Sequence, residues 1–330
     1  MRDRIILGGV ALVALVTLAH CKAKSHSDNT CEGATAATTG QALTMASFRG
    51  ASLPPKTIAL TFDDGPGDRT SELSLWLKDQ GIEAAFFVNG YRFDAQAPGI
   101  MQGLIDDGHI IGNHTETHAS LTGEATATPH PDAATVIKEL TDTDAKIAPF
   151  IKNDRWLFRP PFGDYDQQDN DWLDGTPMKK YIGPILWDVG YKMDAANGEA
   201  ADWDCWQDGS DAKRYSVTDC GDLYITQIKH ISRGIVLMHD PYFNELDPQL
   251  GGTVDMVKYI VPKLKAEGFT FIRVDKIPDI NAVLPPLQGS NPDGGGGSSS
   301  GDNNAAPGQN GSNNNGGAQN VGGTDDKPCP

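Results

Sequence analysis

The chain has 330 residues, a net charge of −17 at pH 7 and an isoelectric point near 4.7. Such an acidic chain is poorly suited to bind nucleic acid or an anionic membrane surface, because both repel negative charge. The charge places no restriction on a neutral glycan. Both ends differ in composition from the middle, so only the middle is expected to build a hydrophobic core.

The first 20 residues have the features of an export signal. Arg2 and Arg4 precede an apolar run of 15 residues, Ile5–Ala19, which is shorter than the roughly 20 residues of a membrane-spanning helix. Cys21 follows as in bacterial lipoprotein signals, in which this cysteine carries the lipid, although His20 replaces the usual small residue. We therefore expect an exported protein, either anchored to a membrane through Cys21 or released as a secreted or periplasmic protein.

Two polar segments flank the apolar middle of the chain. Residues 21–52 predict a flexible tether, and residues 286–330 predict a disordered tail rich in Gly, Asn and Ser. Such segments cannot bury enough apolar surface to offset the entropy of ordering them. Residues 53–285 remain as one folded domain of the size of an α/β barrel, and a monomer is expected.

Export also bears on the five cysteines, because disulfides persist in oxidising compartments. Four cysteines remain when Cys21 is set aside. Cys205 and Cys220 would close a short loop and are the first predicted pair. Cys31 and Cys329 either form a second disulfide or remain free or intermolecular thiols.

Apolar segments alternate with amphipathic ones through the middle of the chain. In chain order they predict a strand at 57–62, a helix at 70–80, a strand at 83–88, a helix at 98–107, a strand at 109–111, a helix at 131–150, strands at 156–158, 185–187 and 234–238, a helix at 252–267 and a strand at 269–274. Nearly continuous apolar strands separated by helices are typical of a parallel sheet covered by helices. We therefore predict a single α/β domain of barrel type.

Ionisable side chains follow the ends of several predicted strands. In α/β barrels these strand ends meet at one rim, where catalytic groups gather. Two histidines with a carboxylate are a common ligand set for a catalytic divalent metal. The spacing of His114 and His118 would place both rings on one face of a helix. Taken alone, this pair or the Asp63–Pro66 turn would more often be structural. The residues at strand ends are Asp63, Asp64, His114, Arg159, Asp188 and His239.

Four motifs occur in order along the chain. They are Thr61-Phe-Asp-Asp-Gly-Pro66, His114-Thr-Glu-Thr-His118, Arg159-Pro-Pro-Phe-Gly163 and Leu237-Met-His239. Together they resemble the polysaccharide deacetylases of the NodB-homology type, carbohydrate esterase family four, over residues 56–275. The resemblance implies a distorted (β/α) barrel and a hydrolase that removes N-acetyl groups from a cell-wall or extracellular polysaccharide, such as peptidoglycan or a chitin-like polymer, releasing acetate.

The resemblance also implies a role for each motif residue. Asp64, His114 and His118 match the metal ligands, with zinc as the first candidate and cobalt or another divalent ion as alternatives. Asp63 matches the catalytic base, and Arg159 the residue that orients this base. The metal and Arg159 would both favour the charged form of Asp63. A metal at this position would also lower the pKa of water and so create a nucleophile near neutral pH.

Two further residues match groups that act later in the reaction. The backbone N–H of Phe162 matches the donor to the oxyanion of the tetrahedral intermediate, where a preorganised donor contributes strongly to the rate. His239 matches the general acid. A histidine suits this role because its ordinary pKa, about 6.5, lies close to working pH.

The family pattern is broken beside the general acid. An aspartate usually supports this histidine, and Gly190 stands at its position here. Asp188, two residues earlier on the same strand face, is our first candidate for the partner of His239. Asp194 lies four residues later, and Asp202 with the following tryptophan could be the displaced end of the motif after an insertion.

The insertion covers residues 191–222. Its aromatic residues, Trp203, Trp206 and Tyr215, either shape a sugar-binding groove or pack inward as a stabilising loop.

Three other functions stay open: an O-acetyl esterase acting on xylan, a non-catalytic glycan-binding lipoprotein that retains the fold, and an amide hydrolase acting on small molecules.

Overall fold

The computed structural model describes residues 47–194, 196–206, 215–240 and 252–286. The predicted export signal, Cys21, Cys31, Cys329 and the predicted tail from residue 287 lie outside these residues. Within the described ranges, no helix has the length and apolar character needed to cross a membrane.

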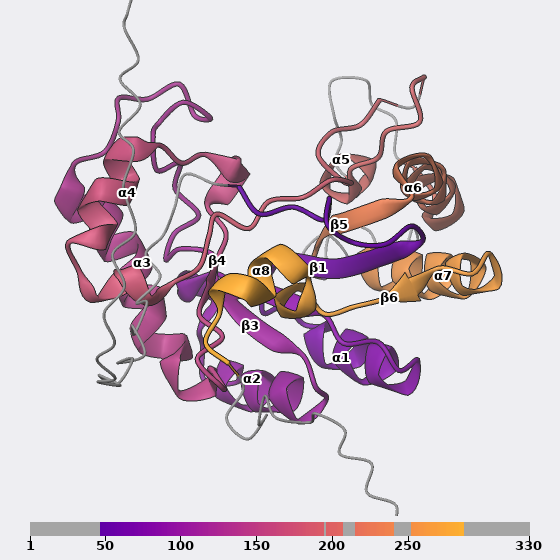
Figure 1. Cartoon of the computed structure of the whole chain (residues 1–330), viewed down its shortest axis with the longest axis horizontal. Helices are drawn as coiled ribbons and strands as arrows, with labels where there is room; N and C mark the ends of the chain where they lie inside the picture. Colours follow the sequence, from indigo (N-terminus) through magenta and orange to yellow (C-terminus); the bar gives the residue numbers. More distant parts are fainter. Residues whose placement is uncertain (1–46, 195, 207–214, 241–251, 287–330) are drawn as a thin grey trace, which may run out of the picture. The chain divides into compact units, whose positions relative to one another are not determined.

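Parallel strands form the centre of the domain (Figure 1). The order in the sheet is β4-β3-β2-β1-β5, and β6 pairs with β1 off this path. The strands are β1 (Thr57–Gly65), β2 (Ala85–Val88), β3 (Ile110–Asn113), β4 (Leu157–Phe158), β5 (Arg233–His239) and β6 (Thr270–Phe271). β1 pairs with β5 from Thr57 to Asp63, while its other edge meets β6 at the start and β2 from Thr61 onward. β1 is therefore the central strand.

Helices cover the sheet and extend beyond the predicted set. The four expected helices are present as α1 (Thr70–Asp79), α2 (Ala97–Asp106), α3 (Ala133–Ile147) and α7 (Thr253–Ala266). Four further helices were not predicted: α4 (Gln167–Asp174), α5 (Asp202–Trp206), α6 (Val217–Ile231) and α8 (Pro278–Val283). Most of α4 is polar, and α5 and α8 have fewer than two turns, so their apolar periodicity is weak.

The two faces of β1 belong to different apolar clusters. Ile58, Leu60 and Phe62 pack with buried residues of α1, α2, α6 and α7. Ala59 belongs to an inner cluster that includes Ile235 of β5 and buried residues of β2, β4 and α8. Side chains alternate between the two faces of a strand, so odd-numbered residues of β1 face the interior.

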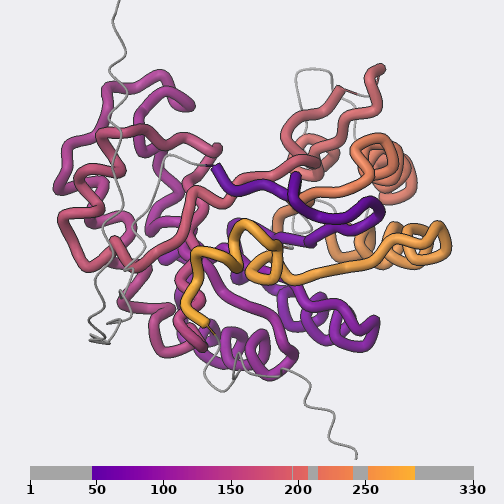
Figure 2. The backbone as a smooth tube through the Cα atoms, viewed as in Figure 1, coloured from indigo at the N-terminus to yellow at the C-terminus, as the bar shows by residue number. Residues whose placement is uncertain are grey.

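Among the described residues, the strands do not form a continuous hydrogen-bonded ring. Residues 182–189, which include the predicted strand 185–187, make isolated parallel bridges instead. Ile182 pairs with Leu157 of β4, and Val189 pairs with Val236 of β5. The first described residues run beside the same segment, where Phe48 pairs with Ile185 (Figure 2). The predicted parallel α/β fold is confirmed, and the gap between β4 and β5 is bridged only at single positions.

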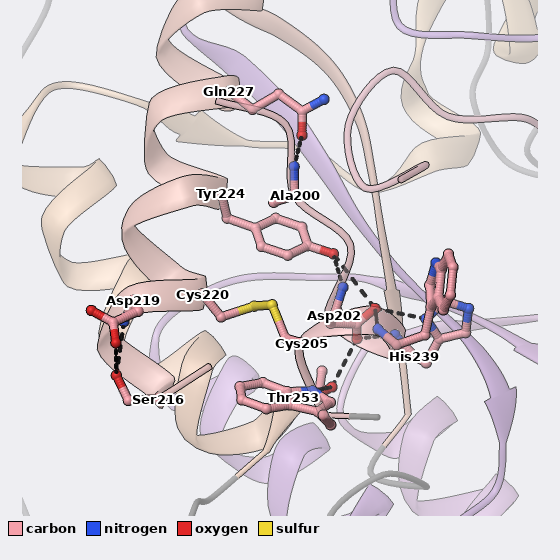
Figure 3. Close-up of a disulfide and its surroundings, with 12 residues drawn as sticks. Ala200, Asp202, Cys205, Ser216, Asp219, Cys220, Tyr224, Gln227, His239 and Thr253 are labelled. Atoms are coloured by element: carbon pink, nitrogen blue, oxygen red, sulfur yellow. Dashed lines mark hydrogen bonds and ion pairs between the residues drawn. A yellow bond between two sulfur atoms is a disulfide. The ribbon is translucent and has the colours of Figure 1, made fainter. Parts of the chain in front are cut away.

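The segment predicted as an inserted loop contains α5 and the start of α6. The predicted disulfide between Cys205 and Cys220 is present and joins these two helices (Figure 3). Trp206 is buried, and Trp203 and Tyr215 are partly buried against the cluster that contains Ile58, Leu60 and Phe62. Inward packing is therefore correct for Trp206, whereas Trp203 also lines the cavity described below.

Candidate active site

Asp63 and His239 meet at the ends of two paired strands. The register of β1 and β5 places these residues directly opposite each other. Asp63 has the same parity as Ala59, so its side chain faces the interior. The pairing of β1 with β2 is irregular between Asp63 and Gly65, and Asp64 has a left-handed backbone with φ 68°. This irregularity lets two consecutive carboxylates line the same cavity, whereas a regular strand would send them to opposite faces.

Arg159 directly follows β4. Its side chain extends into the interior and is fully buried. Its Nη1 donates to Asp63 Oδ1 at 2.6 Å and to Thr61 Oγ1 at 2.9 Å. Its Nε donates to the carbonyl of Ile185 at 2.8 Å, and the guanidinium lies 4.2 Å from the ring centre of Phe87. These contacts fix the guanidinium, and through it the carboxylate of Asp63.

The protein surroundings raise the pKa of Asp63 above its ordinary value. Burial is the largest cause, and the charges of Arg159 and His239 act in the opposite direction without cancelling it. Burial also lowers the pKa of Arg159. Arg159 lowers this pKa as expected, but among the protein groups burial has the larger effect, because removing a carboxylate from water costs more than one partner returns.

Asp64, His114 and His118 form a cluster whose ligand atoms all lie within 4.8 Å of one another. Asp64 Oδ1 lies 3.5 Å from His114 Nε2 and 3.3 Å from His118 Nε2. Among the described residues, this buried oxygen has no hydrogen-bond donor. A buried carboxylate oxygen facing two imidazole nitrogens fits a cation such as zinc, which binds these atom types.

The tautomer of His114 agrees with this fit. Its Nδ1 lies 2.7 Å from the carbonyl of Arg159, which assigns the N–H to Nδ1 and leaves the Nε2 lone pair toward Asp64. Burial, followed by the neighbouring His118, lowers the pKa of His114 to about 3. The ring is therefore neutral at neutral pH, and neutral imidazole is the form that binds metals.

The segment from His114 to His118 is a loop, so the two rings are brought together by its backbone and not by the spacing of a helix. Thr115 and His118 both have left-handed backbones, with φ 67° and 59°. Sequence analysis missed two residues that hold this loop. Asn89 Nδ2 donates to the carbonyl of His114 at 2.6 Å, and Glu139 accepts from both the N–H and the hydroxyl of Thr117. Only Asn89 had a sequence signal, since it follows a predicted strand.

Asp202, not Asp188, is the partner of His239. Asp202 is fully buried, and its Oδ1 lies 2.7 Å from His239 Nδ1 (Figure 3). Its Oδ2 accepts from the His239 N–H at 2.7 Å and from the Thr253 hydroxyl at 2.8 Å. The tyrosine hydroxyl of Tyr224 accepts from the Asp202 N–H at 3.0 Å. Asp202 of α5 therefore takes the place of the motif aspartate. This was the second alternative to Asp188 considered above.

The carboxylate of Asp188 binds backbone N–H groups. Its Oδ2 accepts from the N–H of Gly50 at 2.9 Å and from the N–H of Ile235 at 2.8 Å. These contacts tie the segment between β4 and β5 to its neighbours. The prediction that Asp188 supports His239 is wrong, because its carboxylate binds these amides beside Gly234, near the start of β5, whereas His239 ends that strand.

Burial and Asp202 act in opposite directions on His239. Burial lowers the pKa, but the charge and the hydrogen bond of Asp202 outweigh it and raise the pKa to about 9. An imidazolium at this position persists at neutral pH, so the group can donate a proton.

Six of the eight predicted site residues line one cavity of about 620 Å³, whereas Arg159 lies behind Asp63 and Asp188 lines a neighbouring cavity. Phe162 lies at its wall with a left-handed backbone, φ 60°, and its ring packs edge-on against His118. A second cavity of about 390 Å³ shares Phe162, Trp187, Tyr191 and Lys192 with the first. The lining residues of the larger cavity are Asp63, Asp64, His114, His118, Ala125, Phe162, Trp187, Tyr191, Lys192, Trp203, Leu237 and His239.

Comparison with known proteins finds relatives for part of the chain. The profile of the family described as polysaccharide deacetylase matches residues 50–173. Over these residues the chain is similar to that family. A chitin deacetylase of a Pestalotiopsis species is 36% identical over 110 residues, covering 33% of this chain and 35% of that protein. A peptidoglycan-N-acetylglucosamine deacetylase of Bacillus cereus is 27% identical over 217 residues, covering 65% of this chain and 66% of that protein.

The family resemblance extends to the fold. A crystal structure of a peptidoglycan N-acetylglucosamine deacetylase superposes with a TM-score of 0.52 at 20% identity, covering 70% of this chain and 91% of that structure. The chain spans less than two thirds of the length of either curated relative above.

Proposed function

We propose that the protein is a metal-dependent hydrolase that removes N-acetyl groups from a polysaccharide and releases acetate. The observation that carries this proposal is one cavity whose wall holds the carboxylate of Asp63, the imidazole of His239 and a cluster of side chains that could bind a metal ion. The chitin and peptidoglycan deacetylases named above support an N-acetylglucosamine polymer as substrate, in the cell wall or outside the cell.

Asp64, His114 and His118 would hold the metal. Zinc suits the two imidazole nitrogens and one carboxylate oxygen, and cobalt or another divalent ion could replace it. When bound, such an ion polarises a carbonyl and makes water a nucleophile near neutral pH. Its charge would also offset the burial that raises the pKa of the adjacent Asp63.

The remaining side chains would move the protons. Asp63, held by Arg159, accepts a proton as water adds to the acetyl carbon. The N–H of Phe162 would face the oxyanion, where a preorganised donor stabilises the developing charge. His239, kept cationic by Asp202, donates a proton to the departing nitrogen as the carbon–nitrogen bond breaks, which yields acetate and a free amine on the sugar.

The shape of the site supports a polymer as substrate. The second cavity adjoins the main one at four shared lining residues, so the two together offer room for more than one sugar. Phe162 and Tyr191 are 48% and 62% exposed at the shared wall. Aromatic side chains at such positions can pack against sugar rings while their edges remain in water.

The decisive experiment is mass analysis of chitooligosaccharides and peptidoglycan after incubation with the zinc-loaded protein, with released acetate measured in parallel. We expect a loss of acetyl groups from nitrogen, and Asp63→Asn should lower kcat by about 10²–10⁴-fold. Acetate release from acetylated xylan alone would instead identify an O-acetyl esterase. Glycan binding without acetate release would contradict the proposal and favour a non-catalytic binding protein.

The ends of the chain carry separate proposals. We propose that residues 1–20 direct export, that residues 21–52 tether the catalytic domain (53–285), and that Cys21 carries the lipid anchor if one is present. Labelling with a radioactive fatty acid, compared between the natural chain and Cys21→Ser, tests the anchor. Equal labelling of the two proteins would exclude it.

A further inference from the structure

A second group of metal-binding side chains lies outside the cavity. His130, Asp166 and Asp169 offer three ligand atoms that all lie within 4.8 Å of one another. His130 precedes α3, while Asp166 is the N-cap of α4 and Asp169 lies in its first turn. None of them lines the cavity of the proposed active site.

The buried carboxylate carries the argument. The side chain of Asp169 is 0% exposed, and its Oδ1 points toward His130 Nε2 at 3.6 Å. Among the described residues, this oxygen and His130 Nε2 both lack a hydrogen-bond partner. A buried carboxylate oxygen without a donor is costly, and a cation placed between these two atoms would remove that cost.

The remaining atoms of the three side chains are already used. Asp166 Oδ1 accepts from the N–H of Gln168 at 2.8 Å and from that of Asp169 at 3.0 Å, which leaves Oδ2 facing His130. His130 Nδ1 lies 2.8 Å from the carbonyl of Pro131, which directs the Nε2 lone pair toward the two carboxylates. A histidine that binds a metal commonly donates its other N–H to a carbonyl in this way.

The separations fit a shared ion better than direct hydrogen bonds. His130 Nε2 lies 3.4 Å from Asp166 Oδ2 and 3.6 Å from Asp169 Oδ1. A direct N–H···O bond is about 2.7–3.2 Å long. Ligands about 2.0–2.2 Å from a tetrahedral zinc ion lie about 3.3–3.6 Å apart. In the Asp64 cluster the corresponding separations are 3.3 and 3.5 Å.

We propose that His130, Asp166 and Asp169 form a second, structural site for a zinc-sized divalent cation. Two carboxylates would neutralise the charge of the ion, and the part-exposed edge at Asp166 leaves a position for water. The ion would fasten the segment before α3 to the start of α4. The same two regions are already joined by the hydroxyls of Ser120 and Thr122, which donate to Asp164.

A proton is the competitor for this position. Burial lowers the pKa of His130, but the Pro131 carbonyl and the two carboxylates outweigh it and raise the pKa. A protonated His130 between the carboxylates would form an ion pair that needs no metal.

Zinc stoichiometry separates these two states. The full chain is equilibrated with Zn²⁺ at pH 7.5, dialysed, and its zinc measured by mass spectrometry. We expect two ions per natural chain and one per chain for His130→Gln and for Asp169→Asn. His230→Gln, which alters an exposed histidine of α6, is the matched control and should keep two.

His130→Gln and Asp169→Asn could lose zinc simply by misfolding. A variant that leaves the proposed site intact avoids this ambiguity. Asp64→Asn combined with His118→Gln removes the ligands of the active-site cluster. This variant should retain one zinc ion per chain and show a higher Tm in zinc than in EDTA. Zero zinc in this variant, or one ion in both the natural chain and His130→Gln, would overturn the second site while leaving the proposed catalytic metal untouched.

Discussion

At the residue scale, the pair of His239 and Asp202 sets the pH range of the proposed acid step. His239 can donate only while protonated, so activity should fall as pH rises through its pKa. Asp202→Asn removes the charge that raises this pKa to about 9. We expect the alkaline limb of the kcat profile to move to lower pH by about 1–3 units. A limb at the same pH in the variant would contradict the role of Asp202.

Asp188 provides the contrasting case. Because its carboxylate binds two backbone N–H groups and not His239, Asp188→Asn should leave the pH profile unchanged. Asp188→Ala leaves both donors without their acceptor, and unpaired buried donors cost about 1–3 kcal/mol each. We expect a lower urea midpoint for the alanine variant. A shifted alkaline limb in Asp188→Asn would restore the original interpretation.

At the scale of elements, the disulfide links the helix that carries Asp202 to the helix that carries Tyr224. Replacing Cys205 and Cys220 by serine should lower the free energy of unfolding by about 3 kcal/mol, the value expected for a loop of 15 residues. Since α5 would then hold Asp202 less firmly, kcat should fall as well.

Reducing agent supplies the control for this variant. Dithiothreitol should lower the stability and kcat of the natural protein toward those of the double serine variant, and should leave the variant unchanged. An equal effect on both proteins would show that the reductant acts elsewhere, for example on the other cysteines.

At the scale of the whole molecule, the proposed chemistry lies between Asp63 and His239, and the inner cluster ends with α8. A chain that stops after residue 286 should therefore keep its kcat and its Tm within about 2 °C, since changes outside the packed core have small effects. A chain that stops after Lys276 loses Ile280 and Leu284, which are buried in the inner cluster. That variant should be unstable, because deleting one large core side chain already costs about 2–5 kcal/mol.

These truncations are compared by thermal unfolding and acetate release. Loss of activity in the chain that ends at 286 would show that the predicted tail takes part in function. Full stability in the chain that ends at Lys276 would contradict the role of α8 in the inner cluster.

The sequence alone determined the features that depend on local order. Apolar runs and their spacing predicted four of the helices and the central strands. Within such a segment the period of the apolar residues already reveals the helix or strand, without knowledge of its distant contacts. The motifs carrying Asp63, Asp64, His114, Arg159 and His239 lie at strand ends, and the parallel strands bring them to one rim. Pairing of Cys205 with Cys220 was also predicted from their proximity in sequence.

Only the tertiary structure decided which distant groups meet. Asp202 is 37 residues from His239 in the chain, and it reaches the imidazole because α5 packs against the end of β5. Asp188 lies on the strand face expected for a partner of His239, but its carboxylate accepts hydrogen bonds from backbone amides instead. His130 and Asp169 are likewise brought together only by the packing of α3 beside α4. Sequence spacing identifies neighbours within a helix or strand, whereas contacts across a core depend on how the helices and strands pack.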